Sequence, residues 1–438
     1  MTQNHIFPTS PFTRRRFFQY TGSAALSGSL LAACAGTGGG GGTTGGGGSN
    51  LPALSQWYHQ YGEAGTQQAV LRYAKQYTKA NVTVNWVPGT GNDYPNKLRA
   101  ALLGSNPPDV FELTNPTVDQ VKAGLIEPLD DIIAPVQSDF NPVSLKPLTI
   151  NGKIYAIKMI NDMGLIYYRK SMLQSAGVPF PTTSTTMDDL ISMAKKLSKG
   201  NVKGLYIGPD GGVDALHQIL VWSAGADLIS NDNKKIAFNT DRVATAYEKL
   251  RELNASGGVL PDAPTFWWDP SSLTQGLCAM QWCGLWAMPG ITKALGDDFG
   301  IIPFPMLDAQ GQPATFLGGW AEMVSAKSKN VAAAKEYVKY LWIDNTDIQI
   351  DWNVGYGFHV PPRLSVAAKA DKLKTGPAAQ AVDYLNKYGH AAPPLWDAAM
   401  ETALTDAMSN ILKRGANPTS ELNKAADKAN TELQTLIS

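Results

Sequence analysis

The fold is decided by the stretch from Leu51 to Val87, which reads LPALSQWYHQYGEAGTQQAVLRYAKQYTKANVTVNWV. Its beginning, Leu51–His59, is apolar and aromatic, as expected of a strand. Thr66–Lys79 then places apolar side chains at helical spacing, and Val82–Val87 alternates apolar and polar side chains. This order predicts a β-α-β unit, whose two strands lie parallel in one sheet.

The same alternation continues outward along the chain. Asp93–Leu103 is predicted to be a helix, and Pro108–Phe111 is predicted to begin a strand. A second run starts after Gly152, with predicted strands at 153–157 and 164–168 and predicted helices at 186–197, 242–253, 330–343, 396–413 and 420–437. The sequence therefore predicts an α/β protein with mainly parallel sheets, in which ligands bind at the carboxyl ends of the strands.

The composition excludes several classes of protein. The chain has 438 residues, of which 44% are hydrophobic and 17% are charged. It is long enough for two domains, or three, with large cores, and it is not disordered throughout. Its 37 basic and 37 acidic residues cancel, which argues against a general nucleic-acid binder because such proteins need a basic surface. No run of about 18 apolar residues occurs, so a protein with several membrane spans is not expected.

The first fifty residues are not expected to belong to the fold. Arg14–Arg16 is a basic cluster followed by two phenylalanines, and a weakly apolar stretch then leads to Leu31-Ala32-Ala33-Cys34. This layout is typical of a secretory signal at residues 1–33. The arginines resemble a twin-arginine signal, and the end resembles a bacterial lipobox, whose cysteine (here Cys34) is lipidated. The alternative is a cytosolic chain with an unstructured tail.

The segment at 34–50 is interpreted as the lipidated cysteine and a tether. Ten of the 16 residues at 35–50 are glycine, and such a segment spans about 20–24 Å. Its match to GxGxxG is dismissed because no strand precedes it and no helix follows it. Loss of residues 1–33 leaves 34 basic and 37 acidic residues, a net charge of −3. The two other cysteines, Cys278 and Cys283, either form a disulfide or are two buried thiols.

Several motifs, taken in order, resemble the extracellular solute-binding proteins of ABC sugar importers, the maltose-binding-like type (family 1). The motifs that carry the resemblance are Trp57–Glu63, Asn106–Phe111, Gly124–Leu129, Gly152–Ile157, Leu165–Lys170, Gln275–Met280, Gly284-Leu285-Trp286, Gly318-Gly319-Trp320 and Ser325–Ala334. They extend over essentially all of residues 51–438. Arg169 departs from the family pattern, which has asparagine there, at a position expected to be structural.

The resemblance implies a two-lobed periplasmic-binding-protein fold, of the Venus-flytrap kind, with mixed sheets flanked by helices and with crossing hinge strands. It places the first lobe at 51–160 and 300–340 and the second lobe at 161–299 and 341–438. The implied crossings lie near Ile160–Leu165, near Phe299–Pro303, and in or after the helix at 332–343. The implied function is capture of a carbohydrate by hinge closure and its delivery to the permease subunits of an ABC importer.

The resemblance also implies the location and the assembly state of the protein. The protein is expected to be a monomer outside the cytoplasm, lipid-anchored to the cell membrane at the cell surface or in the periplasm. Enzymatic activity, a cofactor, a metal ion and a nucleic-acid partner are not expected.

A sugar offers apolar ring faces and a rim of hydroxyls, so its site needs aromatic plates with polar groups between them. Five tryptophans fall within 54 residues, namely Trp267, Trp268, Trp282, Trp286 and Trp320. By resemblance, Trp286 and Trp396 occupy the positions of stacking aromatics. Trp320 follows a glycine pair, which allows a ligand to approach the backbone closely.

The predicted aromatic contacts to a ligand are Trp267, Trp268, Trp286, Trp320 and Trp396, and the predicted polar contacts are Glu63, Asn115, Asp162, Glu322, Tyr356 and Arg363. Strand alternation predicts that one of Trp267 and Trp268 faces the cleft and the other faces away. A core position is the alternative for every large aromatic residue, and it is favoured for Trp86, Trp222, Trp342 and Trp352. His217 is expected to be a surface residue.

Two other functions stay open at this point. A secreted carbohydrate-active enzyme also places tryptophan beside paired carboxylates, although no HExxH, GxSxG or Walker pattern occurs in the sequence. A binding protein for another solute, such as a polyamine, iron or a peptide, has the same fold class. The tryptophan-rich set fits a sugar better than these solutes.

Overall fold

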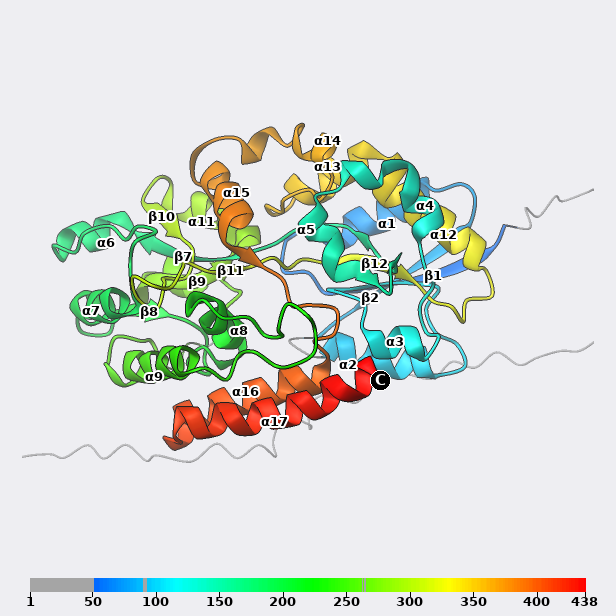
Figure 1. Cartoon of the computed structure of the whole chain (residues 1–438). Helices are drawn as coiled ribbons and strands as arrows, with labels where there is room; N and C mark the ends of the chain where they lie inside the picture. The colour runs from blue at the N-terminus through cyan, green and yellow to red at the C-terminus, as the bar shows by residue number, and fades with distance from the viewer. Residues whose placement is uncertain (1–50, 90–92, 262, 264) are drawn as a thin grey trace, which may run out of the picture. The chain divides into compact units, whose positions relative to one another are not determined.

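Strand pairing divides the described chain into two main sheets, each covered by helices and each forming one lobe (Figure 1). The computed structural model describes residues 51–438 except 90–92, 262 and 264. The predicted signal at 1–33, Cys34 and the glycine-rich tether lie outside the described residues. The α/β class predicted from the alternation of strand and helix patterns is confirmed.

The first lobe is built on a five-stranded sheet in the order β2-β1-β3-β12-β6. β1 pairs in parallel with β2 and with β3, as the β-α-β pattern predicts, whereas β12 runs antiparallel between β3 and β6. The elements are β1 Ala53–His59, α1 Thr66–Gln76, β2 Asn81–Val87, α2 Asp93–Leu103, β3 Val110–Leu113, α3 Val118–Lys122, α4 Asp130–Ile133, α5 Pro142–Leu145, β4 Thr149–Ile150, β5 Lys153–Ile154, β6 Ile157–Lys158, β12 Ala321–Val324, α12 Val331–Lys339 and α13 Thr346–Val354.

The second lobe is built on a four-stranded sheet in the order β10-β7-β9-β8. Its elements are β7 Gly164–Arg169, α6 Lys170–Ser175, α7 Met187–Leu197, β8 Lys203–Tyr206, α8 Val213–Ser223, α9 Asp241–Ala255, α10 Ser271–Thr274, β9 Cys278–Gly284, α11 Met288–Leu295 and β10 Phe299–Ile302. The prediction of mainly parallel sheets is wrong here, because only β8 and β9 pair in parallel. β7 leaves the hinge, whereas β9 and β10 run back towards it.

The remaining elements follow or bridge these sheets. They are β11 Thr315–Phe316, which pairs with β13 Gly389–His390, and the helices α14 Leu364–Ala367, α15 Gly376–Tyr388, α16 Ala398–Arg414 and α17 Pro418–Ile437. α16 and α17 lie side by side and pack against α8 and α9 (Figure 1). The helical character predicted for the C-terminal third of the chain is confirmed.

Three segments cross between the lobes and pair with one another through backbone hydrogen bonds. Asn161 on the first crossing pairs with Val360 on the third, and Asp162 pairs with Gly318 on the second. Because the partners come from distant parts of the chain, these short bridges hold the three crossings at one place. This place is the hinge of the two lobes.

Strand pairing and packing correct part of the predicted division of the chain. Residues 300–302, predicted to open the second part of the first lobe, belong to β10 and pair with β7, so the chain returns to the first sheet between β10 and β12. Residues 346–354, predicted to lie in the second lobe, form α13, whose Ile348 and Trp352 are buried in the same core as Leu54 and Tyr58 of β1. The other limits of the lobes stay predictions.

The two described cysteines are thiols. Cys278 and Cys283 lie on β9, and both are buried and unpaired. Five residues of strand separate them by about 16 Å, which is too far for a disulfide. Burial raises the pKa of both thiols, so they behave as small apolar side chains.

Tryptophan side chains shape the cores of both lobes. Trp222, Trp342 and Trp352, for which the core was favoured, are buried, whereas Trp86 is half-buried. Trp282 on β9 is also fully buried, and it lies across Gly164 of the neighbouring strand β7. A Cβ added to Gly164 would lie 2.0 Å from Trp282 Cζ2. Glycine is therefore required there by the packing of the indole.

The first prediction concerns this contact. We expect Gly164→Ala to lower the free energy of unfolding by about 1–3 kcal/mol, because the buried indole must shift to admit a methyl group. The control is Gly290→Ala in α11, where a Cβ meets nothing within 4 Å; that variant should be neutral or gain up to about 1 kcal/mol. Urea unfolding of both variants measures the difference, and equal effects would contradict the packing argument.

Candidate functional site

A buried histidine joins the loop after β1 to the hinge. His359, on the third crossing segment, has its Nδ1 atom 2.8 Å from Asp162 Oδ1 and its Nε2 atom 3.1 Å from Glu63 Oε1. Asp162 lies on the first crossing segment, and Glu63 follows β1. One imidazole therefore connects two of the predicted ligand contacts at the hinge.

The charges of this group are set by its burial and by its partners. Burial alone would lower the pKa of His359, but Asp162 and Glu63 raise it to about 10. Burial alone would raise the pKa of Glu63, but the hydrogen bond and the charge of His359 lower it. At neutral pH the histidine is therefore an imidazolium, which donates both N–H groups to carboxylates.

On the second lobe, three of the predicted tryptophans lie together. The ring of Trp267 lies 5.7 Å from the Trp268 ring and 5.9 Å from the Trp286 ring. Trp286 Nε1 donates to the Trp268 carbonyl oxygen at 3.2 Å, and Trp267 Nε1 donates to Asp214 Oδ2 at 2.8 Å. All three side chains are half-buried, so each combines a fixed orientation with some exposed ring surface.

The expectation that Trp267 and Trp268 point to opposite faces of a strand is wrong. Their backbone is a turn and not a strand, so the period of two does not apply. Trp268 instead stacks on Phe266, with 4.4 Å between the ring centroids and 4° between the planes. The strand β9 ends at Gly284, and a Cβ there would lie 2.1 Å from the Trp286 ring. Glycine at 284 lets the indole fold back over its own chain.

The loop before the third crossing passes between the Glu63 side chain and the backbone of Trp286 at Gly357. A Cβ at this residue would lie 3.0 Å from Glu63 Cγ and 3.1 Å from the Trp286 carbonyl oxygen. Gly357 therefore links Glu63, and through His359 also Asp162, to the backbone of Trp286, whose ring neighbours the turn at 267–268. These residues come from both lobes and from the hinge.

Trp320 lies on the first-lobe side of the hinge. Its indole is half-buried and stacks on His59, the last residue of β1, at 3.9 Å between centroids and 22° between planes. The glycine pair before it permits a close crossing, because a Cβ on Gly319 would lie 2.2 Å from the Ile160 carbonyl oxygen. The buried Lys158 donates to the Gly319 carbonyl oxygen at 3.1 Å and holds this turn.

Three predicted polar contacts have structural partners instead. Glu322 is fully buried in the first lobe, where Gln56, Tyr58 and Trp342 bond its carboxyl group; its pKa is raised by burial to about 8. Arg363 pairs with Asp139 and donates to the Ile343 carbonyl oxygen, and Tyr356 bonds Asp351 and Arg72. None of these contacts connects the three side chains with the tryptophans of the site.

Trp396 is also held inside the protein. It is 8% exposed, packs edge-to-face against Phe238, and donates from Nε1 to Glu401 Oε2 at 2.6 Å. Glu401 also bonds His217, which is buried, so the expected surface position of this histidine is wrong. Asn115 is half-buried in the loop between β3 and α3.

Sequence reasoning missed His59 and His359. His59 lies inside the first quoted motif, but a single histidine at the end of a strand does not reveal that it stacks on a tryptophan. His359 is 197 residues from Asp162 in the sequence, so no local pattern connects the two. Among the described residues, no group of three or more His, Cys, Asp or Glu side chains is arranged to hold a metal ion.

The second prediction follows from the raised pKa of His359. The histidine contributes its full stabilisation below its ordinary pKa of about 6.5, and loses it as the pH rises through the folded value of about 10. We expect His359→Gln to cost about 3 kcal/mol at pH 7, because two carboxylates lose their buried partner. The difference from the unchanged protein should shrink between pH 7 and pH 10.5.

Urea unfolding of both proteins across this pH range measures the effect. Groups that titrate in both proteins cancel in the difference. A difference that stays constant with pH would contradict the charged state of His359.

Comparison with known proteins agrees with this architecture. Residues 68–381 match the model of a family described as bacterial extracellular solute-binding proteins. An ABC transporter extracellular-binding protein of Pyrococcus horikoshii is 25% identical over 330 residues, which are 71% of this chain and 72% of the relative. The diacetylchitobiose binding protein of Streptomyces coelicolor is 27% identical over 263 residues, 57% of this chain and 59% of that protein.

A solved structure shares the fold. An ABC transporter solute-binding protein of Thermotoga lettingae, bound to α-D-tagatose, has a TM-score of 0.74 and 20% sequence identity, covering 87% of this chain and all of its own. The described part of this chain contains no helix long and apolar enough to cross a membrane. Since the family match extends over more than half of the chain, the protein belongs to the bacterial extracellular solute-binding proteins, which work outside the cytoplasm.

Proposed function

We propose that this protein captures a neutral carbohydrate between its lobes and delivers it to the permease of an ABC importer. The observation that carries the proposal is that half-buried tryptophans and paired carboxylates occur on the segments around the hinge. Trp286 from the second lobe and Trp320 from the first lobe offer flat apolar surfaces. Glu63 and Asp162, which both contact His359, offer acceptors. A sugar ring needs this combination, because its faces are apolar and its rim carries hydroxyls.

The charges of the site favour a neutral ligand over a polyamine. Glu63 and Asp162 both bond the protonated His359, so part of their charge is already balanced within the protein. A dicationic ligand would have to compete with this buried imidazolium. A hydroxyl can use the remaining lone pairs of the carboxylates without displacing it.

The same group argues against glycoside hydrolysis at this place. A general acid needs a carboxyl group that stays protonated, with a raised pKa, whereas the pKa of Glu63 is lowered by His359. The diacetylchitobiose-binding relative supports a carbohydrate ligand, although it covers only part of this chain. We therefore propose a binding protein without enzymatic activity.

The hinge supplies the means of delivery. A ligand held by Trp286 on one lobe and Trp320 on the other has more contacts when the lobes are closed. It therefore shifts the population towards the closed form by its differential affinity. The permease would recognise that form. The protein would act as a monomer, because one chain contains both walls of the site.

The N-terminal segment would attach the protein to the membrane. We propose that residues 1–33 are a twin-arginine-like signal and that Cys34 is lipidated, with the glycine-rich segment to residue 50 as a tether. The protein would then stay at the outer side of the cytoplasmic membrane, near its permease.

The third prediction tests the ligand class and the central tryptophan. In a thermal-shift screen of mono- and oligosaccharides, the cognate sugar should raise the melting temperature of the protein, because it binds only the folded state. Trp286→Ala should then weaken binding of the best sugar by about 2 kcal/mol in calorimetry, because the indole is an anchor plate. Phe180→Ala, an exposed aromatic of the second lobe, is the matched control and should bind normally.

The outcomes separate the three functions. A melting shift with spermidine or a peptide and none with sugars would overturn the ligand class. New reducing ends after incubation with an oligosaccharide would identify an enzyme. Unchanged affinity of Trp286→Ala would remove this residue from the site.

The fourth prediction concerns the anchor. Cells that express the full chain should retain it in the membrane fraction, whereas Cys34→Ser should move it to the soluble fraction outside the cytoplasm, because no acyl chain can be attached. Cys278→Ser controls for the loss of a thiol elsewhere and should stay in the membrane fraction. Equal distribution of all three proteins would contradict lipidation at Cys34.

A further inference from the structure

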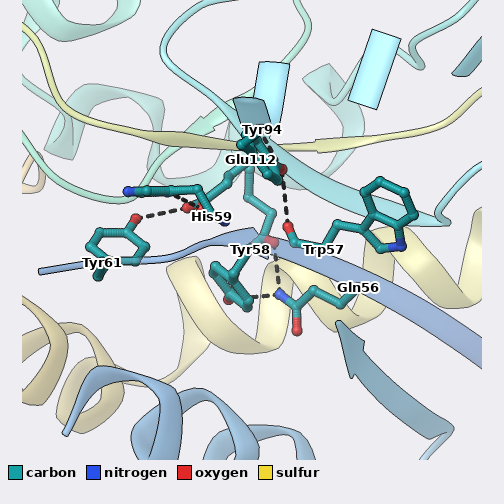
Figure 2. A network of polar contacts seen from close by, with 8 residues as sticks. Gln56, Trp57, Tyr58, His59, Tyr61, Tyr94 and Glu112 are labelled. Atoms are coloured by element: carbon teal, nitrogen blue, oxygen red, sulfur yellow. Dashed lines mark hydrogen bonds and ion pairs between the residues drawn. The ribbon is translucent and has the colours of Figure 1, made fainter. Parts of the chain in front are cut away.

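A fully buried carboxylate lies directly behind the first-lobe face of the site. Glu112 on β3 accepts hydrogen bonds from the His59 backbone N–H at 2.7 Å and from Tyr61 Oη at 2.7 Å (Figure 2). His59 Nδ1 lies 2.5 Å from the same Oε1 atom. Both carboxylate oxygens are thus occupied, by His59 at the end of β1 and by Tyr61 in the loop after it.

This contact fixes the orientation of the His59 ring. The pairing directs Nδ1 towards Glu112 and leaves Nε2 on the other side of the imidazole. A histidine ring nitrogen can exchange a hydrogen bond with a ligand hydroxyl. Nε2 has no hydrogen-bond partner among the described residues, and the His59 side chain keeps 18% of its surface exposed.

The same imidazole supports the Trp320 plate. The His59 ring lies 3.9 Å from the Trp320 ring and also 3.9 Å from the Tyr61 ring. Glu112 bonds the polar atoms of two of these three rings, His59 and Tyr61. The stacked rings of His59 and Trp320 restrict each other's orientation. The orientation of Trp320 therefore depends on Glu112, which holds His59.

We propose that Glu112 is a positioning residue of the ligand site, which holds the His59 ring with Nε2 turned away from Glu112 to bond a ligand hydroxyl and thereby orients Trp320. This inference rests on the proposed carbohydrate-binding function and adds two residues to it. His59 contacts the ligand, and Glu112 acts through His59. A cleft that binds a neutral sugar needs acceptors held in place before the ligand arrives, because ordering them on binding costs affinity.

Three variants separate this role from a general structural one. His59→Phe keeps a ring against Trp320 and removes Nε2, and Glu112→Gln replaces the acceptor with an amide that can donate to Nδ1. Each should weaken binding of the best sugar roughly tenfold, as expected for one lost hydrogen bond with a partner left unpaired. The double variant should be no weaker than either single one, because both changes remove the same interaction.

The control is Tyr337→Phe, which removes a buried hydrogen bond of 2.8 Å to Gln56 in the same lobe. Tyr337→Phe should bind the sugar normally, while its free energy of unfolding should fall by about as much as that of His59→Phe or Glu112→Gln. Urea unfolding of all variants shows whether the losses of affinity follow the losses of stability. If they do, Glu112 is structural and the inference is overturned.

Nuclear magnetic resonance of the histidine ring nitrogens shows which nitrogen of His59 carries a hydrogen. A purely structural role of Glu112 would not predict a change in this quantity. The ligand-free protein should show His59 with the hydrogen on Nδ1, and Glu112→Gln should shift the hydrogen towards Nε2. A wild-type ring with the hydrogen on Nε2 alone, a His59→Phe variant that binds normally, or additive losses in the double variant would each overturn the inference. If the unchanged protein binds no sugar at all, the proposed function itself fails. This outcome distinguishes failure of the proposed function from failure of the inference about Glu112.

Discussion

Four backbone hydrogen bonds hold the three crossing segments side by side. Asp162 and Gly318 exchange two of them, at 3.2 and 2.9 Å, and Asn161 and Val360 exchange the other two, both at 2.9 Å. Asp162, His359 and Trp320 lie within two residues of these bonds, and Glu63 and His59 contact His359 and Trp320, respectively. Because the lobes are otherwise separate sheets, the register of these short bridges sets how the polar groups of one segment face the aromatic groups of another.

The polar groups at this place are already partly paired within the protein. His359 bonds Asp162 and Glu63, and the buried Glu112 is bonded by His59 and Tyr61. Burying an unpaired charge is costly, so a cleft that closes over its ligand must balance its own charges first. The proposed site therefore combines paired acceptors with half-buried aromatic rings. That chemistry suits a neutral ligand with hydroxyl groups.

Some of the predicted polar contacts have partners within the protein, for a physical reason. Glu322 and Arg363 are polar residues near motifs, but the sequence does not say which polar side chains are bonded within the protein. The partners of Glu322 include Gln56, 266 residues earlier in the chain. Trp396 was chosen because its position matches that of a stacking aromatic, yet its indole packs against Phe238 and bonds Glu401. Only the packing of distant segments decides such positions.

The sequence by itself determined the alternation of strands and helices, the α/β class and the family, because periodicity and motifs are local properties of the chain. The sequence also pointed to Trp286 as a predicted ligand contact. Its indole lies over Gly284, where a side chain would clash with the ring, so this local packing can be read from neighbouring residues. The tertiary structure alone decided the antiparallel pairing of β12, the third crossing at Val360 and the bonds of His359. These depend on contacts between residues hundreds of positions apart, for which a single sequence carries no local signal.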